Sequence, residues 1–356
     1  LEPTAAELDE THVFPVENFK QMARYGFTGI GVPKEYGGVG GGMTEEVIAV
    51  SEFAKKCMAS AATLSIHLIA PQAIAKYGTE AQKCLPRLPK GGELGAFALT
   101  EPGAGSDAAR AQTTAILDTE TNEYVLSGTK CFISGGSRAG VLVVFALTNP
   151  AAGLKGMSAI IVEAGTPGFT VGKVENKMGL RGSETAELIF EDCRVPAENL
   201  LGQEGKGFKI AMQALDGARI GVGAQSIGLA EGALELTVKY MHERVQFGKP
   251  IATLQGLQWY VADMATKTEA AKWLTYYAAY LDDSGKPFGK EAAMCKLNAS
   301  ENARFVTNLA LQIHGGYGYM HDYPLERMYR DAKITEIYEG TSEIHKVVIS
   351  RAVLGK

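Results

Sequence analysis

The chain has 356 residues, which at about 150 residues per domain allows two to three domains and excludes a small scaffold held together by disulfides or metals. Hydrophobic residues make up 46% and charged residues 21%, a composition typical of a folded globular protein, which excludes a disordered or fibrous one. The net charge is -5 and no run of basic residues is present, so we expect no nucleic-acid partner.

The sequence predicts no membrane span, targeting segment or metal site. The longest unbroken apolar run, Val141–Leu147, has seven residues against the roughly 18 needed to cross a bilayer. The chain opens at Leu1 without a basic and apolar leader, so we expect no targeting signal and an N-terminal domain truncated at its start. The histidines lack the spacing of metal ligands. The five cysteines, odd in number and widely separated, are interpreted as reduced, buried thiols: Cys57, Cys84, Cys131, Cys193 and Cys295.

Residues 1–95 are interpreted as an all-α domain. Their apolar positions follow the helical period, as Val47, Val50 and Ala54 do, and glycines and prolines separate the segments.

Residues 96–205 are interpreted as a β domain, because short β-rich segments alternate there with turns rich in Gly, Pro, Asn and Thr. Their close spacing without intervening helices favours antiparallel pairing in a barrel or sandwich. The expected strands are Glu123–Leu126, Lys130–Ser134, Val141–Leu147, Ser158–Val162, Phe169–Val174 and Glu187–Phe190.

Residues 206–356 are interpreted as an antiparallel bundle of four helices. The helical period is clearest over Thr253–Asp282, and a helix of that length is roughly 45 Å long. The other expected helices are Gly221–Gln246, Gly289–His314 and Ser342–Leu354. The predicted fold class is therefore α+β multidomain, in the order α domain, β domain, α bundle.

Two motifs in the β domain place glycines beside hydroxyl groups. Phe97–Asp107 reads FALTEPGAGSD, an apolar strand followed by glycines that let backbone N–H groups approach a flat or anionic ligand. The alternative interpretation is an ordinary Pro-Gly turn. Cys131–Gly136 reads CFISGG, which by itself indicates only a hairpin.

Two further motifs lie in the helical region. Arg244–Pro250 and Gln312–Tyr319 join an arginine, whose fork suits a pyrophosphate, to glycines at a helix end. Arginine in a last turn also simply complements the helix dipole. Ile334–Ile344 reads ITEIYEGTSEI and places Glu339 just before Gly340 and a new helix; the alternative is an acidic residue near a helix N-terminus.

In this order and at these separations, the four motifs resemble the acyl-CoA dehydrogenase family, and the resemblance extends from about Phe14 to Leu354. Within the family, the sequence segments most resemble those of the short-chain, butyryl-CoA members. The resemblance implies the same three-domain order, FAD as cofactor, a homotetramer built as a dimer of dimers and an electron-transfer flavoprotein as electron partner. It also implies bacterial cytoplasm, which we favour, or the mitochondrial matrix.

The resemblance assigns the cofactor site to residues of all four motifs. Many relatives have Trp at the position of Phe132 and Thr at that of Ser134, and both departures keep the aromatic face and the hydroxyl group. The implied cofactor-binding residues are Phe97, Leu99, Thr100, Gly105, Ser106, Phe132, Ile133, Ser134, Arg244, Phe247, Gln255, Gln312, Ile313, His314, Gly315, Gly316, Thr341, Ser342 and Glu343.

The resemblance assigns catalysis to Glu339, which would remove the α-proton of an acyl-CoA thioester while the β-carbon loses a hydride to the flavin, giving a trans-2-enoyl-CoA. Some relatives carry the base at the position that Ala218 occupies here, so Glu339 is the one base candidate. The implied substrate-binding residues are Ser106, Asp216, Arg219 and Gly340.

Several alternatives stay open. The same site run backward is an enoyl-CoA or aryl-acryloyl-CoA reductase, and branched short acyl groups fit the motifs equally well. A DNA-binding flavoprotein of the same superfamily is disfavoured by the net charge, and an acyl-CoA oxidase by the chain length. A purely structural bundle would not need Glu339, Thr100 and Arg244 together.

Overall fold

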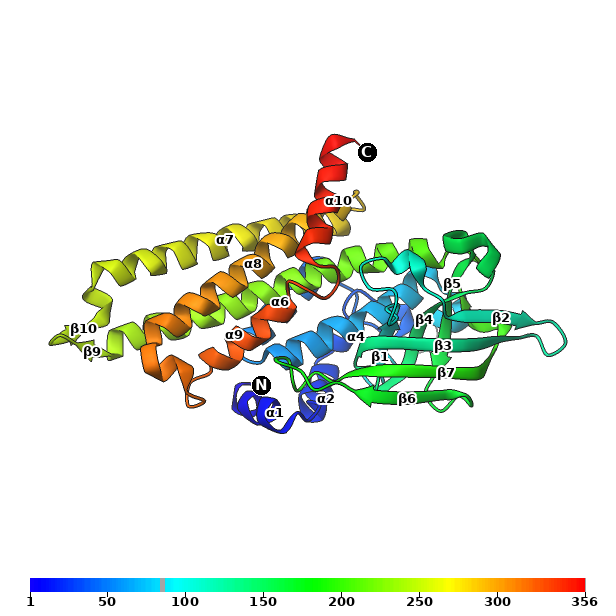
Figure 1. Ribbon diagram of the computed structural model, residues 1–356, viewed down its shortest axis with the longest axis horizontal. Coiled ribbons are helices and arrows are strands. Elements are labelled where there is room, and N and C mark those ends of the chain that lie inside the picture. The colour runs from blue at the N-terminus through cyan, green and yellow to red at the C-terminus, as the bar shows by residue number, and fades with distance from the viewer. Residues whose placement is uncertain (84–86, 356) are drawn as a thin grey trace.

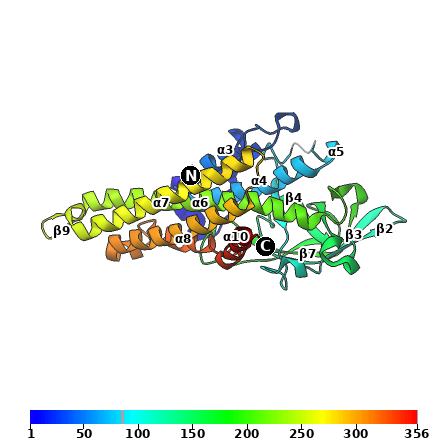
Figure 2. The ribbon, with the colours of Figure 1, turned by 90° about the horizontal axis from the view of Figure 1, so that it is seen from above.

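The computed structural model describes residues 1–83 and 87–355, and it has a long helical bundle at one end and a β-sheet at the other (Figure 1). Short helices open the chain, and α3 and α4 run beside the bundle (Figure 2). The N-terminal helices are α1 (Ala5–Thr11), α2 (Val16–Arg24), α3 (Met43–Ala54), α4 (Met58–Tyr77) and α5 (Glu80–Lys83).

The start of α3 is held by a residue of the bundle. The backbone N–H groups of Met43 and Thr44 donate to the carboxylate of Asp283 at 2.6 and 3.0 Å. A carboxylate at a helix N-terminus satisfies otherwise unpaired N–H groups and complements the helix dipole. Because Asp283 ends a bundle helix, this contact ties the N-terminal helices to the C-terminal region.

Helix α4 forms the core of the N-terminal region. Among the described residues it is the one helix long and apolar enough to cross a membrane by length and composition, but 83% of its most apolar window is buried within this fold. A core helix of a globular protein passes the same composition test. The expected absence of a membrane partner therefore stays a prediction.

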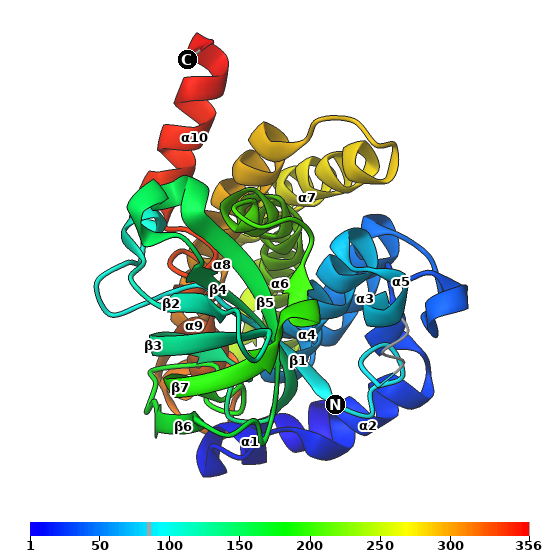
Figure 3. The same ribbon diagram turned by 90° about the vertical axis from the view of Figure 1, so that its right-hand side faces the viewer.

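The sheet has eight strands in the order β6-β7-β3-β2-β4-β5-β8, with β1 paired to β4 (Figure 3). Alternate residues of most of these strands meet in one apolar cluster, so the sheet curves around its own core. The strands are β1 (Leu94–Ala98), β2 (Thr114–Asp118), β3 (Glu123–Ser134), β4 (Ala139–Leu147), β5 (Met157–Glu163), β6 (Phe169–Val174), β7 (Thr185–Pro196) and β8 (Leu200–Leu201).

The pairing of the sheet is antiparallel except at two places. β4 pairs in parallel with β1 and, at one position, with β2. A parallel pair needs a long connection, and the chain from β1 to β4 supplies one that contains β2 and β3. Close spacing of strand-like segments predicted only local antiparallel pairing, so it missed these two contacts.

The C-terminal region contains three long helices and two shorter ones, with a small hairpin at the end of the bundle that lies away from the sheet (Figure 1). The predicted bounds of α8 and α10 agree with the structure, and α10 projects away from the bundle (Figures 1 and 3). The elements are α6 (Gly207–Glu243), β9 (Val245–Gln246), β10 (Lys249–Pro250), α7 (Gln255–Asp283), α8 (Gly289–His314), α9 (Leu325–Ile334) and α10 (Ser342–Leu354).

Two features of the bundle differ from the prediction. Helix α6 begins well before the expected Gly221, because its glycines mark close packing rather than a helix end: a Cβ on Gly228 would lie 2.1 Å from the backbone oxygen of Ser51. Helix α9 was not expected, and both α9 and α10 pack on α8.

The described cysteines match the prediction, since Cys57, Cys131, Cys193 and Cys295 are all buried and unpaired. Cys84 lies outside the described residues. Within residues 1–83 and 87–355, no group of three or more His, Cys, Asp or Glu side chains is placed to hold a metal ion.

Candidate active site

Glu339 lies in the short connection between α9 and α10, and its backbone is left-handed, with a φ of +54°. Gly340 follows with a φ of +102°, a conformation that suits glycine because it has no Cβ. The hydroxyl group of Thr341 accepts a hydrogen bond from the N–H of Ile344 at 3.4 Å and caps α10. A left-handed residue other than glycine costs about 1–3 kcal/mol, so surrounding contacts must hold Glu339 in place.

Two cations from other helices hold this connection by its carbonyl groups. Arg219 of α6 donates to the Glu339 oxygen at 3.3 Å and to the Asp216 carboxylate at 2.6 Å. Lys296 of α8 donates to the Gly340 oxygen at 2.6 Å. Arg219 and Lys296 are both buried, so the bundle presents two positive charges to the loop that carries Glu339.

The surroundings of Glu339 favour proton transfer. Burial raises the pKa of its carboxyl group, and the nearby charges of Arg219 and Lys296 oppose that rise. No described residue donates a hydrogen bond to the carboxyl group, so its oxygens are free for a ligand. The neighbouring Tyr338 is fixed by donating its hydroxyl hydrogen to the side chain of Gln225. A half-buried carboxyl group with a raised pKa and no internal partner is a candidate general base.

The two motifs of the β domain lie side by side. The N–H of Cys131 donates to the Thr100 oxygen at 2.9 Å, which brings the loop after β1 against the end of β3. Phe132 has a φ of +56° and a side chain 65% exposed. Leu99 and Ile133 are buried in the core, so these positions offer backbone groups rather than side chains to a ligand.

The predicted residues at the far end of the bundle form a second group. Tyr240 stacks on His314 with ring centroids 4.1 Å apart, and Arg244 lies 5.2 Å from the centroid of the Tyr317 ring. Phe247, at the turn of the β9–β10 hairpin, has a φ of +54° and is 89% exposed. These contacts bring the Arg244 and Gln312 motifs together. The prediction that both motifs belong to one site requires this proximity.

The structure does not bring all the predicted cofactor residues together within one chain. Lys296, which contacts the Glu339 loop, and His314 are eighteen residues apart in α8, which at 1.5 Å per residue is about 27 Å. The predicted cofactor residues therefore fall into separate sets: one in the β domain, one directly after Glu339, and one around His314. The β-domain set comprises Phe97, Leu99, Thr100, Gly105, Ser106, Phe132, Ile133 and Ser134, the set after Glu339 comprises Thr341, Ser342 and Glu343, and the set around His314 comprises Arg244, Phe247, Gln255, Gln312, Ile313, Gly315 and Gly316.

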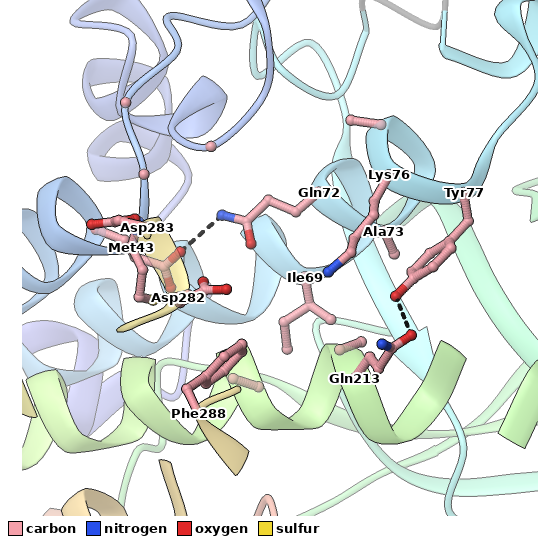
Figure 4. Close-up of a pocket in the computed structure, with 18 of the residues that line it drawn as sticks. Met43, Ile69, Gln72, Ala73, Lys76, Tyr77, Gln213, Asp282, Asp283 and Phe288 are labelled. Carbon is pink, nitrogen blue, oxygen red and sulfur yellow. Dashed lines mark hydrogen bonds between the residues drawn. The ribbon is translucent and has the colours of Figure 1, made fainter. Parts of the chain in front are cut away.

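A cavity of about 290 Å³ lies between α3, α4, α6 and the turn after α7 (Figure 4). Gln72 donates to the Glu46 carboxyl group at 2.8 Å in its wall, and burial raises the pKa of Glu46 to about 7. Lys76 and Asp282 point into the cavity (Figure 4). The cavity wall does not include Glu339; Ala218, which does line it, directly precedes Arg219 on α6.

Three buried polar groups could not be predicted from the sequence pattern. Lys296 lies in an ordinary helical pattern, and Glu46 follows one other acidic residue, Glu45, at the start of α3. Lys130 is buried against Glu101, with its ammonium group 2.7 Å from the carboxylate. A periodicity argument assigns charged residues to the surface, and only tertiary contacts show that these are inside.

Comparisons with known proteins agree on one family. Family models match residues 1–92 (acyl-CoA dehydrogenase, N-terminal domain), 96–193 (middle domain) and 205–354 (C-terminal domain). The chain belongs to the acyl-CoA dehydrogenase family. Its members are FAD-dependent oxidoreductases that act on a CH–CH group, and the three-domain fold described above is that of the family.

The chain is similar to relatives of short acyl-CoA specificity. It is 80% identical to "Acryloyl-CoA reductase (NADH)" of Anaerotignum propionicum, over 99% of this chain and 90% of that protein. It is 48% identical to the solved butyryl-CoA dehydrogenase of Megasphaera elsdenii, with a TM-score of 0.97 over 99% of this chain and 94% of the other. A chain in the structure described as the electron transferring flavoprotein of Acidaminococcus fermentans is 51% identical, with a TM-score of 0.98 over 100% of this chain and 94% of the other.

The residues present fit an FAD molecule. Phe132 and Phe247 expose aromatic faces, and Gly315 and Gly316 leave open space where a Cβ would lie. The hydroxyl oxygen of Ser342, at the N-terminus of α10, is buried without a partner among the described residues. Exposed aromatic rings, open backbone and an unpaired buried hydroxyl group are features that a large, flat, polar cofactor would complete.

Proposed function

We propose that this chain interconverts a short saturated acyl-CoA thioester and its trans-2-enoyl-CoA, with Glu339 moving the α-proton. The observation that carries the proposal is the Glu339 carboxyl group, whose pKa is raised by burial and whose backbone is held by Arg219 and Lys296. Bound FAD would supply the hydride acceptor or donor for the β-carbon. Glu339 then accepts the α-proton when the saturated thioester is oxidised and donates it when the enoyl thioester is reduced.

The chain must make a weakly acidic C–H bond reactive. The α-proton of a thioester is on the order of ten pKa units less acidic than a carboxylic acid, which corresponds to roughly 14 kcal/mol. Hydrogen bonds to the thioester carbonyl would supply part of this, and the raised pKa of Glu339 supplies more, because it makes the carboxylate a stronger base. Ser106, Asp216, Arg219 and Gly340 are proposed to hold the substrate near Glu339.

We infer that each FAD is shared between two subunits. The Glu339 loop contacts α8 at Lys296, whereas the proposed cofactor residues around His314 lie about 27 Å farther along the same helix. Phe247, Gln255 and Gln312 are exposed. A second copy placing its hairpin over the first copy's Phe132 would unite the β-domain set and the set around His314. A homotetramer built as a dimer of dimers accommodates this arrangement, and we keep the division of the chain at residues 95 and 205 as part of the proposal.

An electron-transfer flavoprotein is the proposed electron partner. The support is the 51% identical chain in the Acidaminococcus fermentans electron transferring flavoprotein structure. Bacterial cytoplasm remains the proposed location, with the mitochondrial matrix as the alternative, since both bacterial and mitochondrial relatives match.

A second candidate is the reductive direction, with a short 2-enoyl thioester as the oxidant. The specific support is the 80% identity to the acryloyl-CoA reductase of Anaerotignum propionicum, which exceeds the 48% identity to the butyryl-CoA dehydrogenase. The residues that move the proton and hold the thioester are the same in both directions.

An anaerobic flavin titration tests the proposal and the direction together. Oxidised holoenzyme is mixed with acetyl-, propionyl-, butyryl-, isobutyryl- and octanoyl-CoA, and dithionite-reduced holoenzyme with acryloyl-, crotonyl- and cinnamoyl-CoA. We expect propionyl- or butyryl-CoA to bleach the flavin and acryloyl- or crotonyl-CoA to restore its colour. Response only to octanoyl-CoA or cinnamoyl-CoA would contradict the short-chain assignment, and no response to any thioester would contradict the proposal as a whole.

A further inference from the structure

Lys296 is unusual among the buried charges of this protein. Its side chain is fully buried in α8, yet no carboxylate of the described residues lies within ion-pair distance of its ammonium group. The other fully buried lysine, Lys130, is neutralised by Glu101 at 2.7 Å. A buried charge without an ion pair is costly, so a lysine that served packing alone would be expected to have a carboxylate partner, as Lys130 has.

The ammonium group of Lys296 is directed instead at the loop that carries Glu339. Its one hydrogen bond within the described residues goes to the Gly340 oxygen at 2.6 Å. A charged donor at that distance makes a strong hydrogen bond. Gly340 is also confined on its other side, because a Cβ there would lie 3.2 Å from the His345 ring. The peptide after Glu339 is therefore held between α8 and α10.

We propose that Lys296 is a positioning residue for Glu339: its ammonium group fixes the Gly340 carbonyl and thereby holds the left-handed backbone that directs the Glu339 carboxyl group. This inference rests on the proposed function, since it assigns a role to Lys296 in the same reaction. Arg219 holds the Glu339 carbonyl from α6, and Lys296 holds the next carbonyl from α8. Hydrogen bonds from two helices to two successive carbonyl groups restrict the backbone of the loop.

The charge of Lys296 also acts on the carboxyl group. Arg219 and Lys296 both lower the pKa of Glu339 against the effect of burial. Burial lowers the pKa of Lys296 to about 8, and the carboxyl groups of Glu339, Glu336 and Glu343 oppose that fall. Two other titratable groups near the loop are neutral: burial lowers the pKa of His345 on α10 to about 3, and burial raises the pKa of the Tyr338 hydroxyl group. Removing the Lys296 charge should therefore raise the pKa of Glu339.

The test compares Lys296→Met with Lys272→Met in the FAD-loaded enzyme. Lys272 bonds to Glu231 at 2.9 Å between α7 and α6 and serves as a control for the loss of a bundle lysine. Flavin reduction is followed in stopped flow with the thioester that bleaches the wild type. We expect Lys296→Met to slow reduction about 10- to 100-fold at unchanged FAD content, because a base displaced by about 1 Å loses that much. Lys272→Met should stay within twofold of the wild type.

The pH profile separates positioning from general destabilisation. The rate rises with pH as Glu339 loses its proton, so a raised pKa moves the half-maximal point to higher pH in Lys296→Met. Lys296→Arg keeps a charged donor and should restore both the profile and part of the rate. If Lys296→Met fails to fold, Lys296→Gln, which keeps a donor and loses the charge, should show the same shift. An unshifted profile with a rate within twofold of Lys272→Met would overturn the proposal.

A crystal structure of Lys296→Met holoenzyme decides the proposal independently of the substrate. We expect the Gly340 carbonyl to move and the φ of Glu339 to leave the left-handed region. If no thioester bleaches the wild-type flavin, the proposed function fails while this structural comparison still decides the role of Lys296. An unchanged 339–340 backbone would overturn the positioning role.

Discussion

Two loops of this molecule have the same backbone strain and opposite surroundings. Glu339, between α9 and α10, and Phe247, in the β9–β10 hairpin, both have a φ of +54°. The Glu339 loop is held by Arg219 and Lys296, whereas Phe247 is 89% exposed. Strain that costs about 1–3 kcal/mol persists where contacts hold it. The comparison teaches that the chain itself positions Glu339, the proposed base, whereas it leaves the side chain of Phe247 exposed.

The largest expected effect is on the rate of flavin reduction, when Glu339 is changed. Glu339→Gln keeps the size of the side chain and removes the proton acceptor, so we expect flavin reduction by the active thioester to fall at least about 1000-fold. Stopped-flow absorbance measures the rate, and the flavin spectrum of the variant should show full FAD content. Glu235→Gln, at an exposed position on α6, is the control and should react like the wild type. A Glu339→Gln rate within tenfold of the control would mean that another group moves the proton.

Glu46 provides a comparison with Glu339, because its pKa is also raised and it is buried, but its backbone is not strained. It therefore tests whether a raised pKa alone indicates a catalytic base. Its pKa is about 7 in the folded state and 4.5 in the unfolded chain, so the folded state binds more protons between these values and stability falls as pH rises through this window. Glu46→Gln should remove that loss. Above pH 7, we expect the free energy of unfolding of the variant to be higher than that of the wild type by up to about 3 kcal/mol.

Urea unfolding at pH 5 and pH 8 measures this effect. The advantage of Glu46→Gln should appear at pH 8 and largely disappear at pH 5, where the wild-type carboxyl group is protonated in the folded state. An advantage of equal size at both pH values would show that Glu46 does not titrate in this window.

Arg219→Met removes one of the two cationic side chains that donate hydrogen bonds to the carbonyl groups of the Glu339 loop. The loop loses a hydrogen bond at 3.3 Å, and Glu339 loses a cation that lowers its pKa. We expect flavin reduction to slow about 10- to 50-fold near neutral pH and its half-maximal point to move to higher pH. Arg194→Met removes an exposed arginine of the sheet and is the control. A slower rate without a shift of the pH profile would indicate that Arg219 contributes contacts alone.

The smallest expected effect is at the exposed hairpin. Phe247→Ala removes an aromatic side chain that is 89% exposed, so the melting temperature of the FAD-free protein should change by less than about 2 °C. Release of FAD on dilution, followed by flavin fluorescence, should increase about five- to tenfold. Val245→Ala in the same hairpin is the control for hairpin stability. Unchanged FAD release would contradict the inference that the hairpin completes a cofactor site.

The sequence predicted the parts of this fold that depend on local patterns. The period of apolar residues predicted α7 and α8, and the family resemblance assigned the base to Glu339 in the ITEIYEGTSEI motif, an assignment that stays a proposal. The part of α6 before Gly221 was missed because the glycines of this helix, among them Gly221, resemble those of a helix end, although they allow close packing. The parallel pairing of β1 with β4 depends on a long connection that no local pattern reports.

The hydrogen bonds that hold the Glu339 loop could not be predicted from the sequence, for a physical reason. Arg219 was assigned to the substrate by resemblance, and its hydrogen bond to the Glu339 oxygen joins residues 120 positions apart. Lys296 reaches Gly340 across 44 positions. Each residue by itself looks like a surface charge on a helix. Burial and direction emerge only when α6, α8 and α10 pack together.

The most direct test of this account is a crystal structure of the FAD-loaded enzyme with a non-reactive short acyl-CoA analogue. We predict that the Glu339 carboxyl group contacts the α-carbon of the analogue bound to its own chain. We also predict that each FAD touches Phe132 of one subunit and Phe247 of another. Glu339 turned away from the α-carbon, or an FAD held by both aromatic residues of a single chain, would contradict it.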